Sequence, residues 1–425
     1  MFYFQLFVKK IPIQLSVRLE RVADIKLKME QKERLFIQLR YFMTRLKAER
    51  EMTDMIENIA EKFLMESAPG AVTTFNGKEY SYFGGTSYYE LHKNEQVVNS
   101  AIDALKKYGI TSSSSRSSYG TTQLLLDVER EASQYFNCDD AVYLASGFLT
   151  DLAAVQAFIN KNMFDIVFID EISHYSNDYA SKLSGKPVYQ FSHLDYNDLE
   201  TKIARYLPPN NKPLIISDGI FPIHGRIAPA DKYAAIANKY NGLVWLDDAH
   251  ALGIIGENGR GTFEHFGMQS TNLFFGGTFS KAFGGFGGII PGEKSFIEEI
   301  RNNQIQSGAT PVPSAAAAAS LTGMRLLKSN PQFRIKLWEN AKRLKAGLRQ
   351  LGIEADETHV PIAAWTMKSK SEMEKLQKDL LKKNIVIQFI QYVGAGDSGA
   401  LRIVVFSTHT AEQIDNLISE LKRII

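Results

Sequence analysis

The chain has 425 residues, of which 44% are apolar and 23% charged, and its formal net charge is +2. This length exceeds what one small hydrophobic core organises, so two or more lobes are expected, and the near-neutral charge gives no reason to expect nucleic acid as a partner. The single cysteine, Cys138, excludes an internal disulfide and fits a reducing compartment.

The first fifty residues differ from the rest in charge. They carry 12 Lys and Arg against 5 Asp and Glu, a net of +7, which leaves −5 for the remainder. Residues 16–66 repeat apolar side chains among charged ones without Pro or Gly, which predicts a helix. Three interpretations stay open for this basic extension: a membrane-surface or partner-binding helix, an arm packed on the body, or sequence upstream of a later start at Met43 or Met52.

The apolar start of the chain, residues 1–8, does not have the order of a signal peptide. Lys9, Lys10 and Pro12 follow it at once, whereas a signal peptide places its charges first. No stretch reaches the roughly 20 apolar residues that a bilayer-spanning helix needs. The sequence therefore predicts a cytoplasmic protein without a transmembrane segment.

An alternation of short apolar runs with longer amphipathic stretches extends from Asn99 to about Leu321. The apolar runs predict strands at 141–144, 165–169, 213–217, 243–246, 273–275 and 288–290. Helices are predicted at 147–159 and 229–240. Because the strands are apolar on both faces, we expect a mostly parallel sheet covered by helices, with ligands at the carboxyl ends of the strands.

After Gly323 the pattern becomes that of a small α+β domain. Helices are predicted at 330–351, 371–383 and 411–424, and strands at 362–366, 386–389 and 401–406. Thr410 and Gln413 have the spacing of a capping box for the last helix. The predicted organisation is a basic helical extension (1–50), an N-terminal arm (51–98), a large domain (99–322) and a small C-terminal domain (323–425).

Two motifs at predicted strand ends contain side chains that can bind a cofactor or take part in catalysis. Lys281 lies in a loop rich in glycine and hydroxyl groups, directly after an apolar run, where a lysine can form a Schiff base with an aldehyde cofactor. The strand 243–246 ends in Asp247-Asp248-Ala249-His250. Acid and histidine could also hold a metal, but no third ligand is apparent at a characteristic spacing.

Together these motifs meet the needs of pyridoxal phosphate (PLP), which requires a lysine, a carboxylate for the pyridine nitrogen, a stacking group and a phosphate cradle. Lys281 can bind the aldehyde and Asp247 can keep the ring nitrogen protonated. His250 can reach the ring hydroxyl. His174 can lie flat on the ring.

The phosphate cradle is predicted from two segments. Ser146-Gly147-Phe148 opens a predicted helix, so that its amides and the helix dipole suit a phosphate. Thr278 adds a hydroxyl three residues before Lys281.

From about Ser87 to Leu421 the chain resembles the α-oxoamine synthases, which include 8-amino-7-oxononanoate synthase, 2-amino-3-ketobutyrate CoA ligase, 5-aminolevulinate synthase and serine palmitoyltransferase. Residues 247–261 fit the family's pattern D-[DE]-[AS]-H-x-x-G-x-x-G-x-x-G-R-G. The lysine loop 278–285 and the pair Ser173-His174 also match. So do Asp218-Gly219-Ile220-Phe221 and the C-terminal segment around Arg402.

The resemblance implies an α/β, fold-type I, aspartate-aminotransferase-like enzyme with a large mostly parallel sheet domain and a small α+β domain. It implies a PLP-dependent acyltransferase that condenses a small amino acid with an acyl-CoA or acyl carrier. Arg402 would hold the substrate carboxylate and Lys281 would remove the Cα proton. A homodimer with shared active sites is also implied, in which Thr310 reaches the phosphate of the neighbouring chain.

The chain departs from the family pattern mainly where the family binds substrate. The family has Ser-Met-Asp-Gly where this chain has Pro222-Ile223-His224-Gly225, so a contact of the serine with the ring hydroxyl is lost. His224 either faces the substrate instead or has a structural role in its loop. Residues 109–116 replace the family's glycine-rich motif, and Leu125 replaces the histidine that usually follows that motif. The family's motif near the start of the chain is only faintly present, in residues 87–91. These departures indicate a divergent member.

Two other functions stay open. A PLP enzyme of this fold can be an aminotransferase or an aldol-cleaving enzyme, because fold and cofactor do not determine the reaction. A non-catalytic scaffold is the third possibility, and the intact Lys281, Asp247 and His250 argue against it.

Overall fold

The computed structural model describes residues 63–268 and 272–425. The chain divides into the units Met1–Leu64 and Met65–Ile425, and the second contains the fold described here. The predicted basic helix lies outside the described residues except for positions 63–66, which are not helical. Instead, Met65 forms an isolated antiparallel bridge with Phe75.

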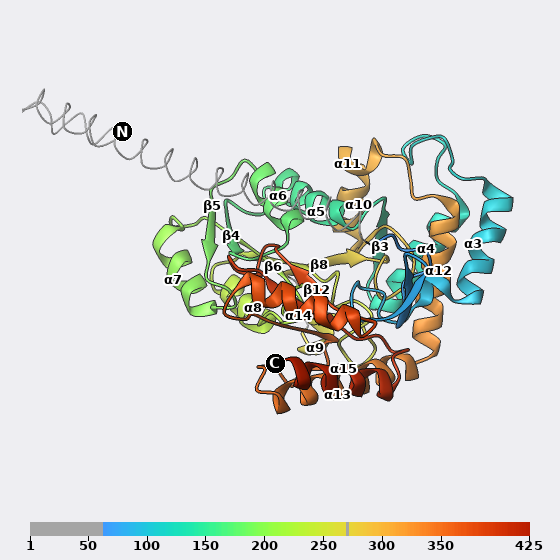
Figure 1. Cartoon of the computed structure of the whole chain (residues 1–425). Helices are drawn as coiled ribbons and strands as arrows, with labels where there is room; N and C mark the ends of the chain where they lie inside the picture. Colours follow the sequence, from blue (N-terminus) through green and yellow to red (C-terminus); the bar gives the residue numbers. More distant parts are fainter. Residues whose placement is uncertain (1–62, 269–271) are drawn as a thin grey trace, which may run out of the picture. The chain divides into compact units, whose positions relative to one another are not determined.

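A seven-stranded sheet forms the centre of the second unit, with strand order β3-β9-β8-β7-β6-β4-β5 (Figure 1). The strands from β5 to β8 are parallel, whereas β9 runs antiparallel to both β8 and β3. Their bounds are β3 Asp140–Leu144, β4 Ile166–Asp170, β5 Val188–Phe191, β6 Pro213–Asp218, β7 Leu243–Asp247, β8 Leu273–Thr278 and β9 Gly288–Gly292. The mostly parallel sheet is therefore confirmed, and β5 is a strand that the apolar pattern did not predict.

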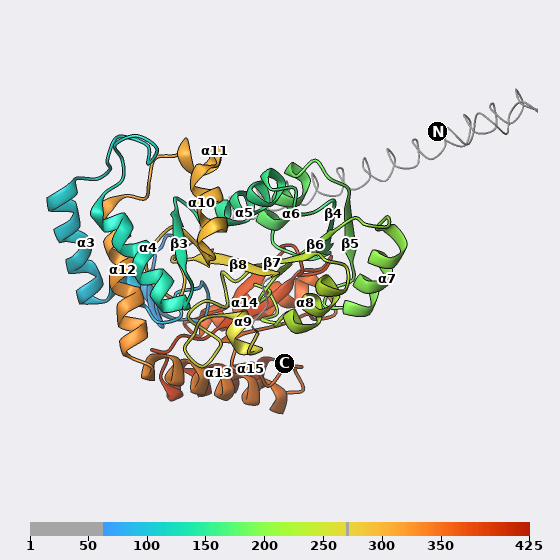
Figure 2. The same ribbon diagram turned by 180° about the vertical axis from the view of Figure 1, so that it is seen from behind.

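Helices cover both faces of this sheet (Figures 1 and 2). On one face lie α5 (Phe148–Asn160), α6 (Tyr175–Leu183) and α10 (Lys294–Asn302), and on the other lie α8 (Ala230–Lys239) and α9 (Thr262–His265). A cluster of buried apolar side chains from α5, α10 and the strands fills the space beneath the first group. This packing explains why the central strands are apolar on both faces.

The remaining helices of the large sheet region lie at its ends. They are η2 Leu91–Lys93, α3 Glu95–Tyr108, α4 Gln123–Phe136, α7 Tyr196–Tyr206, α11 Gln304–Ser307 and α12 Ser314–Ser329. The predicted domain boundary at 322/323 falls within α12. The domain limits themselves stay predictions.

The C-terminal part contains two small sheets. One has the order β10-β13-β12 and is antiparallel, with β10 Ile362–Trp365, β12 Gln388–Ile390 and β13 Ala400–Val404. The other joins the hairpin β1 (Val72–Phe75) and β2 (Lys78–Tyr82) to β11 (Ile385–Val386). The single strand predicted at 386–389 is thus divided, because the chain changes its pairing partner at Ile387.

Three helices cover these small sheets: α13 (Gln332–Gln350), α14 (Lys370–Lys382) and α15 (Ala411–Ile424). Their apolar faces form a second buried cluster with β10, β12 and β13. The capping box predicted for the last helix is confirmed, since the Thr410 and Gln413 side chains each bond the other's backbone N–H. Among the helices in 63–268 and 272–425, none has the length and apolar composition needed to cross a bilayer.

Candidate active site

The carboxyl ends of the parallel strands bring acidic side chains together. Asp218 ends β6 and Asp247 ends β7, and the two residues are paired directly across the strands. Asp247 is buried, and its Oδ1 accepts a hydrogen bond of 2.9 Å from the Ala249 N–H. The carboxylate is therefore held in one orientation at the edge of the sheet where ligands bind.

Lys281 lies in the turn that follows β8. Gly284 shapes this turn at φ +65°, and a Cβ there would lie 2.3 Å from the backbone nitrogen of His92, so only glycine fits. Burial lowers the pKa of Lys281, although the charges of Asp247 and Asp218 act in the opposite direction. Burial thus favours the neutral amine, which is the nucleophilic and basic form.

His174 precedes α6 and caps it. Its Nδ1 accepts from the Ser176 N–H at 3.2 Å and lies 2.6 Å from the Ser176 hydroxyl, while its own backbone N–H donates to Asp218 Oδ2 at 2.9 Å. Burial lowers the pKa of His174. The ring is therefore neutral, with its Nδ1 used as an acceptor and its orientation fixed.

His250 has a partner that lies 162 residues away in the sequence. Its Nδ1 is 2.7 Å from the hydroxyl of Tyr88, and both side chains are buried. Burial lowers the pKa of His250 well below its usual value, and the charges of Lys281 and Arg402 add to this effect. Tyr88 was not predicted as a site residue, because nothing near it in the sequence indicates a histidine partner.

The two segments of the predicted phosphate cradle are in contact. A Cβ at Gly147 would lie 2.7 Å from the Thr278 Cβ, so the bare backbone of 146–148 packs against Thr278. The Phe148 N–H donates to Ser146 Oγ at 3.2 Å, and Thr278 Oγ1 lies 2.8 Å from the hydroxyl of Ser280. Ser280 is a further hydroxyl at this place that was not predicted.

This donor set fits PLP. A helix of 13 residues begins at Phe148, so the positive end of its dipole and the hydroxyls of Thr278 and Ser280 lie at a glycine cradle that a side chain would fill. Lys281 and Asp247 act on one another electrostatically from adjacent strand ends. The amine and the carboxylate thus come from the ends of the adjacent strands β8 and β7, and the segment 146–148 follows β3, which β9 separates from β8.

Arg402 is a buried cation on β13, the central strand of its sheet. Its Nε donates to the carbonyl of Pro222 at 2.7 Å and its Nη1 to Gln388 Oε1 at 2.8 Å, and both acceptors are neutral. None of the ion pairs within the described part of the chain includes Arg402, which is only 4% exposed. Its charge nevertheless acts on Lys281 and His250, so Arg402 lies within electrostatic reach of both residues.

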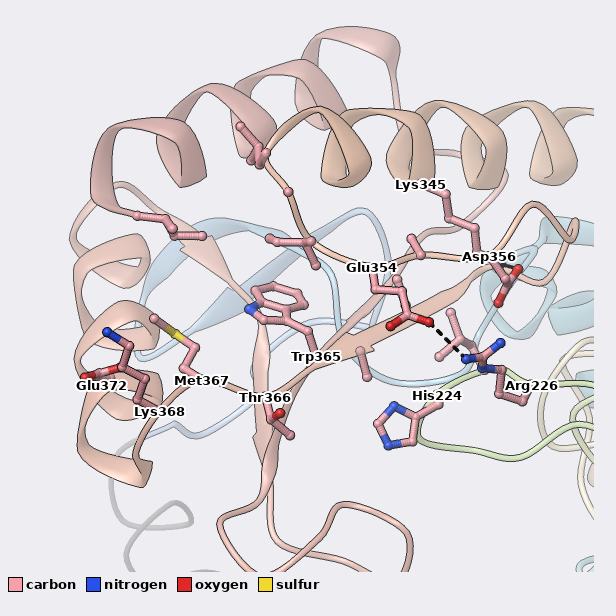
Figure 3. Close-up of a pocket in the computed structure, with 18 of the residues that line it drawn as sticks. His224, Arg226, Lys345, Glu354, Asp356, Trp365, Thr366, Met367, Lys368 and Glu372 are labelled. Carbon is pink, nitrogen blue, oxygen red and sulfur yellow. Dashed lines mark hydrogen bonds and ion pairs between the residues drawn. The ribbon is translucent and has the colours of Figure 1, made fainter. Parts of the chain in front are cut away.

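Two predicted site residues do not lie with Lys281, Asp247 and Arg402. Thr310 is exposed in a loop before α12. His224 lines a cavity of about 1020 Å³ together with Arg226 and Trp365, and this lining does not include Lys281 (Figure 3). The Nε2–H of His224 donates to the carbonyl of Gly394 at 2.9 Å.

Asp151 is a buried carboxyl group that was not predicted as a site residue. Its Oδ1 accepts from the Trp245 indole N–H at 2.9 Å, while its Oδ2 is buried without a hydrogen-bond partner among the described residues. Burial, and then the charge of Asp247, raise the pKa of Asp151 well above its usual value. In sequence it resembles any acidic residue in the first turn of a helix. No cluster of three potential metal ligands occurs in the described ranges.

Comparison with known proteins gives consistent matches over most of the chain. A profile of the family aminotransferase class I and II matches residues 85–421. The chain is 30% identical over 362 residues to an 8-amino-7-oxononanoate synthase of Thermosipho melanesiensis, covering 85% of this chain and 92% of that protein. It is 29% identical over 363 residues to a serine palmitoyltransferase of Sphingobacterium spiritivorum, covering 85% and 90%.

Solved structures show the same fold. A serine palmitoyltransferase from S. paucimobilis with bound PLP superposes with a TM-score of 0.79 at 24% identity, covering 89% of this chain and 96% of that one. The expected architecture of a large sheet domain with a small C-terminal domain is thereby confirmed.

Proposed function

Because the chain belongs to the aminotransferase class I and II family, we propose that it condenses a small amino acid with an acyl-CoA or acyl carrier. It is a PLP-dependent transferase of fold type I. The observation that carries the proposal is Arg402, a buried cation that has no carboxylate partner among residues 63–268 and 272–425 and lies within electrostatic reach of Lys281. A buried unpaired guanidinium is costly unless an anion binds it, and an amino acid supplies such an anion.

The residues that would hold the cofactor are the four side chains and the phosphate cradle described above. Lys281 would hold the aldehyde, Asp247 the ring nitrogen, His250 the ring hydroxyl and His174 the ring face. The segment 146–148 with Thr278 would hold the phosphate. When bound, PLP withdraws electrons from the α-carbon of an amino acid attached to it.

The chain's own residues would position the substrate and move its proton. Arg402 would bind the carboxylate through its guanidinium fork, which sets the direction of the Cα–H bond. Lys281 Nζ would accept the Cα proton, because burial favours its neutral form. The neutral His174 offers an Nε2–H as a hydrogen-bond donor on the opposite side of its ring from Ser176.

The names of the relatives support an acyl transfer to an amino acid. One relative is named a serine palmitoyltransferase, which specifies both an amino acid and an acyl group for that protein. We extend only the reaction class to this chain. A small amino acid as acceptor, a homodimer in which Thr310 reaches the neighbouring subunit, a substrate-binding role of His224 and a cytoplasmic location are further parts of the proposal.

A second candidate function is an aminotransferase or an aldol-cleaving reaction in the same site. The family description itself favours the former, since it names aminotransferases. An aminotransferase would use Lys281, Asp247 and Arg402 in the same roles, whereas aldol cleavage breaks the Cα–Cβ bond and leaves the Cα–H bond intact. They differ from the acyl transfer in needing no acyl-CoA.

The test is to load the purified protein with PLP and incubate it with glycine, alanine or serine and acyl-CoA of short, medium or long chain. We expect free CoA thiol to be released only when amino acid and acyl-CoA are both present. Lys281→Ala is expected to abolish both CoA release and covalent trapping of the cofactor by borohydride. Formation of a keto acid and pyridoxamine phosphate without CoA release would instead identify an aminotransferase.

A further inference from the structure

The segment 391–399, which follows β12, extends from the small sheet to the candidate active site. The Gly394 carbonyl accepts the hydrogen bond from His224, and a Cβ at Gly394 would lie 3.1 Å from Ile172 Cδ1. Within the segment, the Ala395 N–H donates to the carbonyl of Tyr392 at 2.9 Å. The turn is therefore held against residues that come shortly after β4 and β6.

This turn places the ring of Tyr392 beside His174. The ring centroids of Tyr392 and His174 are 6.1 Å apart at 42°, and those of Tyr392 and Tyr175 are 4.8 Å apart at 72°. Two aromatic neighbours in such tilted geometry fix a ring well. Tyr392 thus borders the residue that would lie on the cofactor ring.

The hydroxyl of Tyr392 is an available hydrogen-bond donor. Burial raises its pKa, and Tyr175 and the charges of Asp218 and Asp247 raise it further, so the phenol stays protonated. The hydroxyl therefore lies within electrostatic reach of the carboxylates at the ends of β6 and β7. In the described part of the chain no hydrogen bond engages this hydroxyl.

Tyr392 and Arg402 have different neighbours around Lys281. The charge of Arg402 acts on Lys281 and also on Tyr82, Tyr88 and His250, whereas the charges that act on Tyr392 are those of Asp218 and Asp247, two carboxylates that also act on Lys281. If Arg402 binds the amino-acid carboxylate, the donor at Tyr392 is left for the other substrate. The acceptor that an acyl-CoA offers at its reacting carbon is the thioester carbonyl oxygen.

We propose that the Tyr392 hydroxyl donates a hydrogen bond to the carbonyl oxygen of the acyl donor during carbon–carbon bond formation, an inference that rests on the proposed function. The amino-acid α-carbon bonds to the thioester carbon, and the carbonyl oxygen takes up the displaced electron pair. That pair returns when the carbon–sulfur bond breaks and CoA leaves as its thiolate. Tyr392 keeps its proton and stabilises the charge on the oxygen only while it exists.

The test compares Tyr392→Phe, which retains the ring packed on His174, with Tyr206→Phe as a matched control. Tyr206 stacks on Tyr189 at 4.3 Å and belongs to α7, away from the site. Loss of one donor to a developing oxyanion lowers kcat about 100- to 1000-fold. We expect this loss of CoA release for Tyr392→Phe and none for Tyr206→Phe.

Three further measurements separate this role from a structural one. The amino-acid affinity, read from the absorbance of the bound cofactor, is expected to change less than about twofold in Tyr392→Phe, and melting temperature and cofactor content to stay as in the wild type. CoA release by Tyr392→Phe at the wild-type rate, or a loss of amino-acid affinity equal to the loss of kcat, would overturn this inference and leave the proposed function standing. A wild-type protein that releases no CoA would overturn the proposed function and this inference with it.

Discussion

At the scale of single residues, burial gives ordinary basic side chains their special properties. Arg402 has two of its three nitrogens bonded to neutral oxygen atoms, which satisfy hydrogen bonds without neutralising the charge. Lys281, close to it, is driven towards the neutral amine. A site that binds an amino acid needs both a buried guanidinium for the carboxylate and a buried amine whose pKa is lowered.

Arg402→Ala tests this account directly. We expect amino-acid binding to weaken by about 2–5 kcal/mol, because a buried charge pair loses one partner. Arg402→Lys is the matched variant: it keeps the charge but not the planar fork, so we expect an intermediate loss. The affinity is read by titrating the cofactor absorbance with glycine, alanine or serine. Wild-type affinity in Arg402→Ala would remove this residue from the site.

At the scale of elements, the start of α5 and the end of β8 form one structural unit. The helix begins at Phe148 directly after Gly147, whose φ of −59° is one that any residue adopts. Glycine is needed there only because the Thr278 side chain occupies the space of a Cβ. The cradle therefore depends on packing between the two elements and not on backbone strain.

Gly147→Ala is expected to lower stability by about 1–3 kcal/mol through overpacking, and to weaken retention of the cofactor phosphate by moving Thr278. Gly292→Ala at the end of β9 is the control, because a Cβ there meets only ordinary contacts at 3.4 and 3.7 Å. Urea unfolding measures the first effect, and PLP dissociation during dialysis measures the second. If Gly147→Ala and Gly292→Ala had the same stability in urea and lost PLP at the same rate, the packing argument would be refuted.

At the scale of the whole second unit, the hairpin β1–β2 is tied into the C-terminal sheets through His409. The ring of His409 stacks on Phe83 at 4.3 Å, its Nδ1 accepts from the Phe406 N–H at 2.8 Å, and its Nε2–H donates to the Tyr82 carbonyl at 3.1 Å. Residues near both ends of the described chain thus meet at one buried imidazole. Burial lowers the pKa of His409 to about 4.

The consequence is a defined loss of stability in acid. The unfolded chain takes up the His409 proton near pH 6.5 and the folded chain only near pH 4, so the unfolded state binds more protons between these values. The contribution of the neutral His409 to the free energy of unfolding is complete above pH 6.5, and this free energy falls by roughly 3 kcal/mol as the pH drops to 4. His409→Gln should reduce this slope in urea unfolding measured at several pH values. An unchanged slope would contradict a neutral buried His409.

The predicted and the missed site residues differ in how far their partners lie along the chain. Asp247, Lys281 and Ser146 were recognisable because each follows an apolar run within a few residues, so that local sequence alone places it at a strand end. The strand predicted at 386–389 was divided because its two halves pair with different partners, which no local pattern records. His224 carried no local signal of the cavity that it lines.

The sequence by itself determined six of the seven strands of the large sheet, the positions of the chemical groups at strand ends and the family, because apolar periodicity and motif spacing are local properties of the chain. Tertiary structure alone decided which groups meet: Tyr88 lies with His250, Tyr392 lies with His174, and Arg402 has no carboxylate partner in the part of the chain that the structure describes. Such contacts form when packing of the sheet and its helices brings distant segments together. Burial, which sets the protonation of those groups, exists only in the folded molecule.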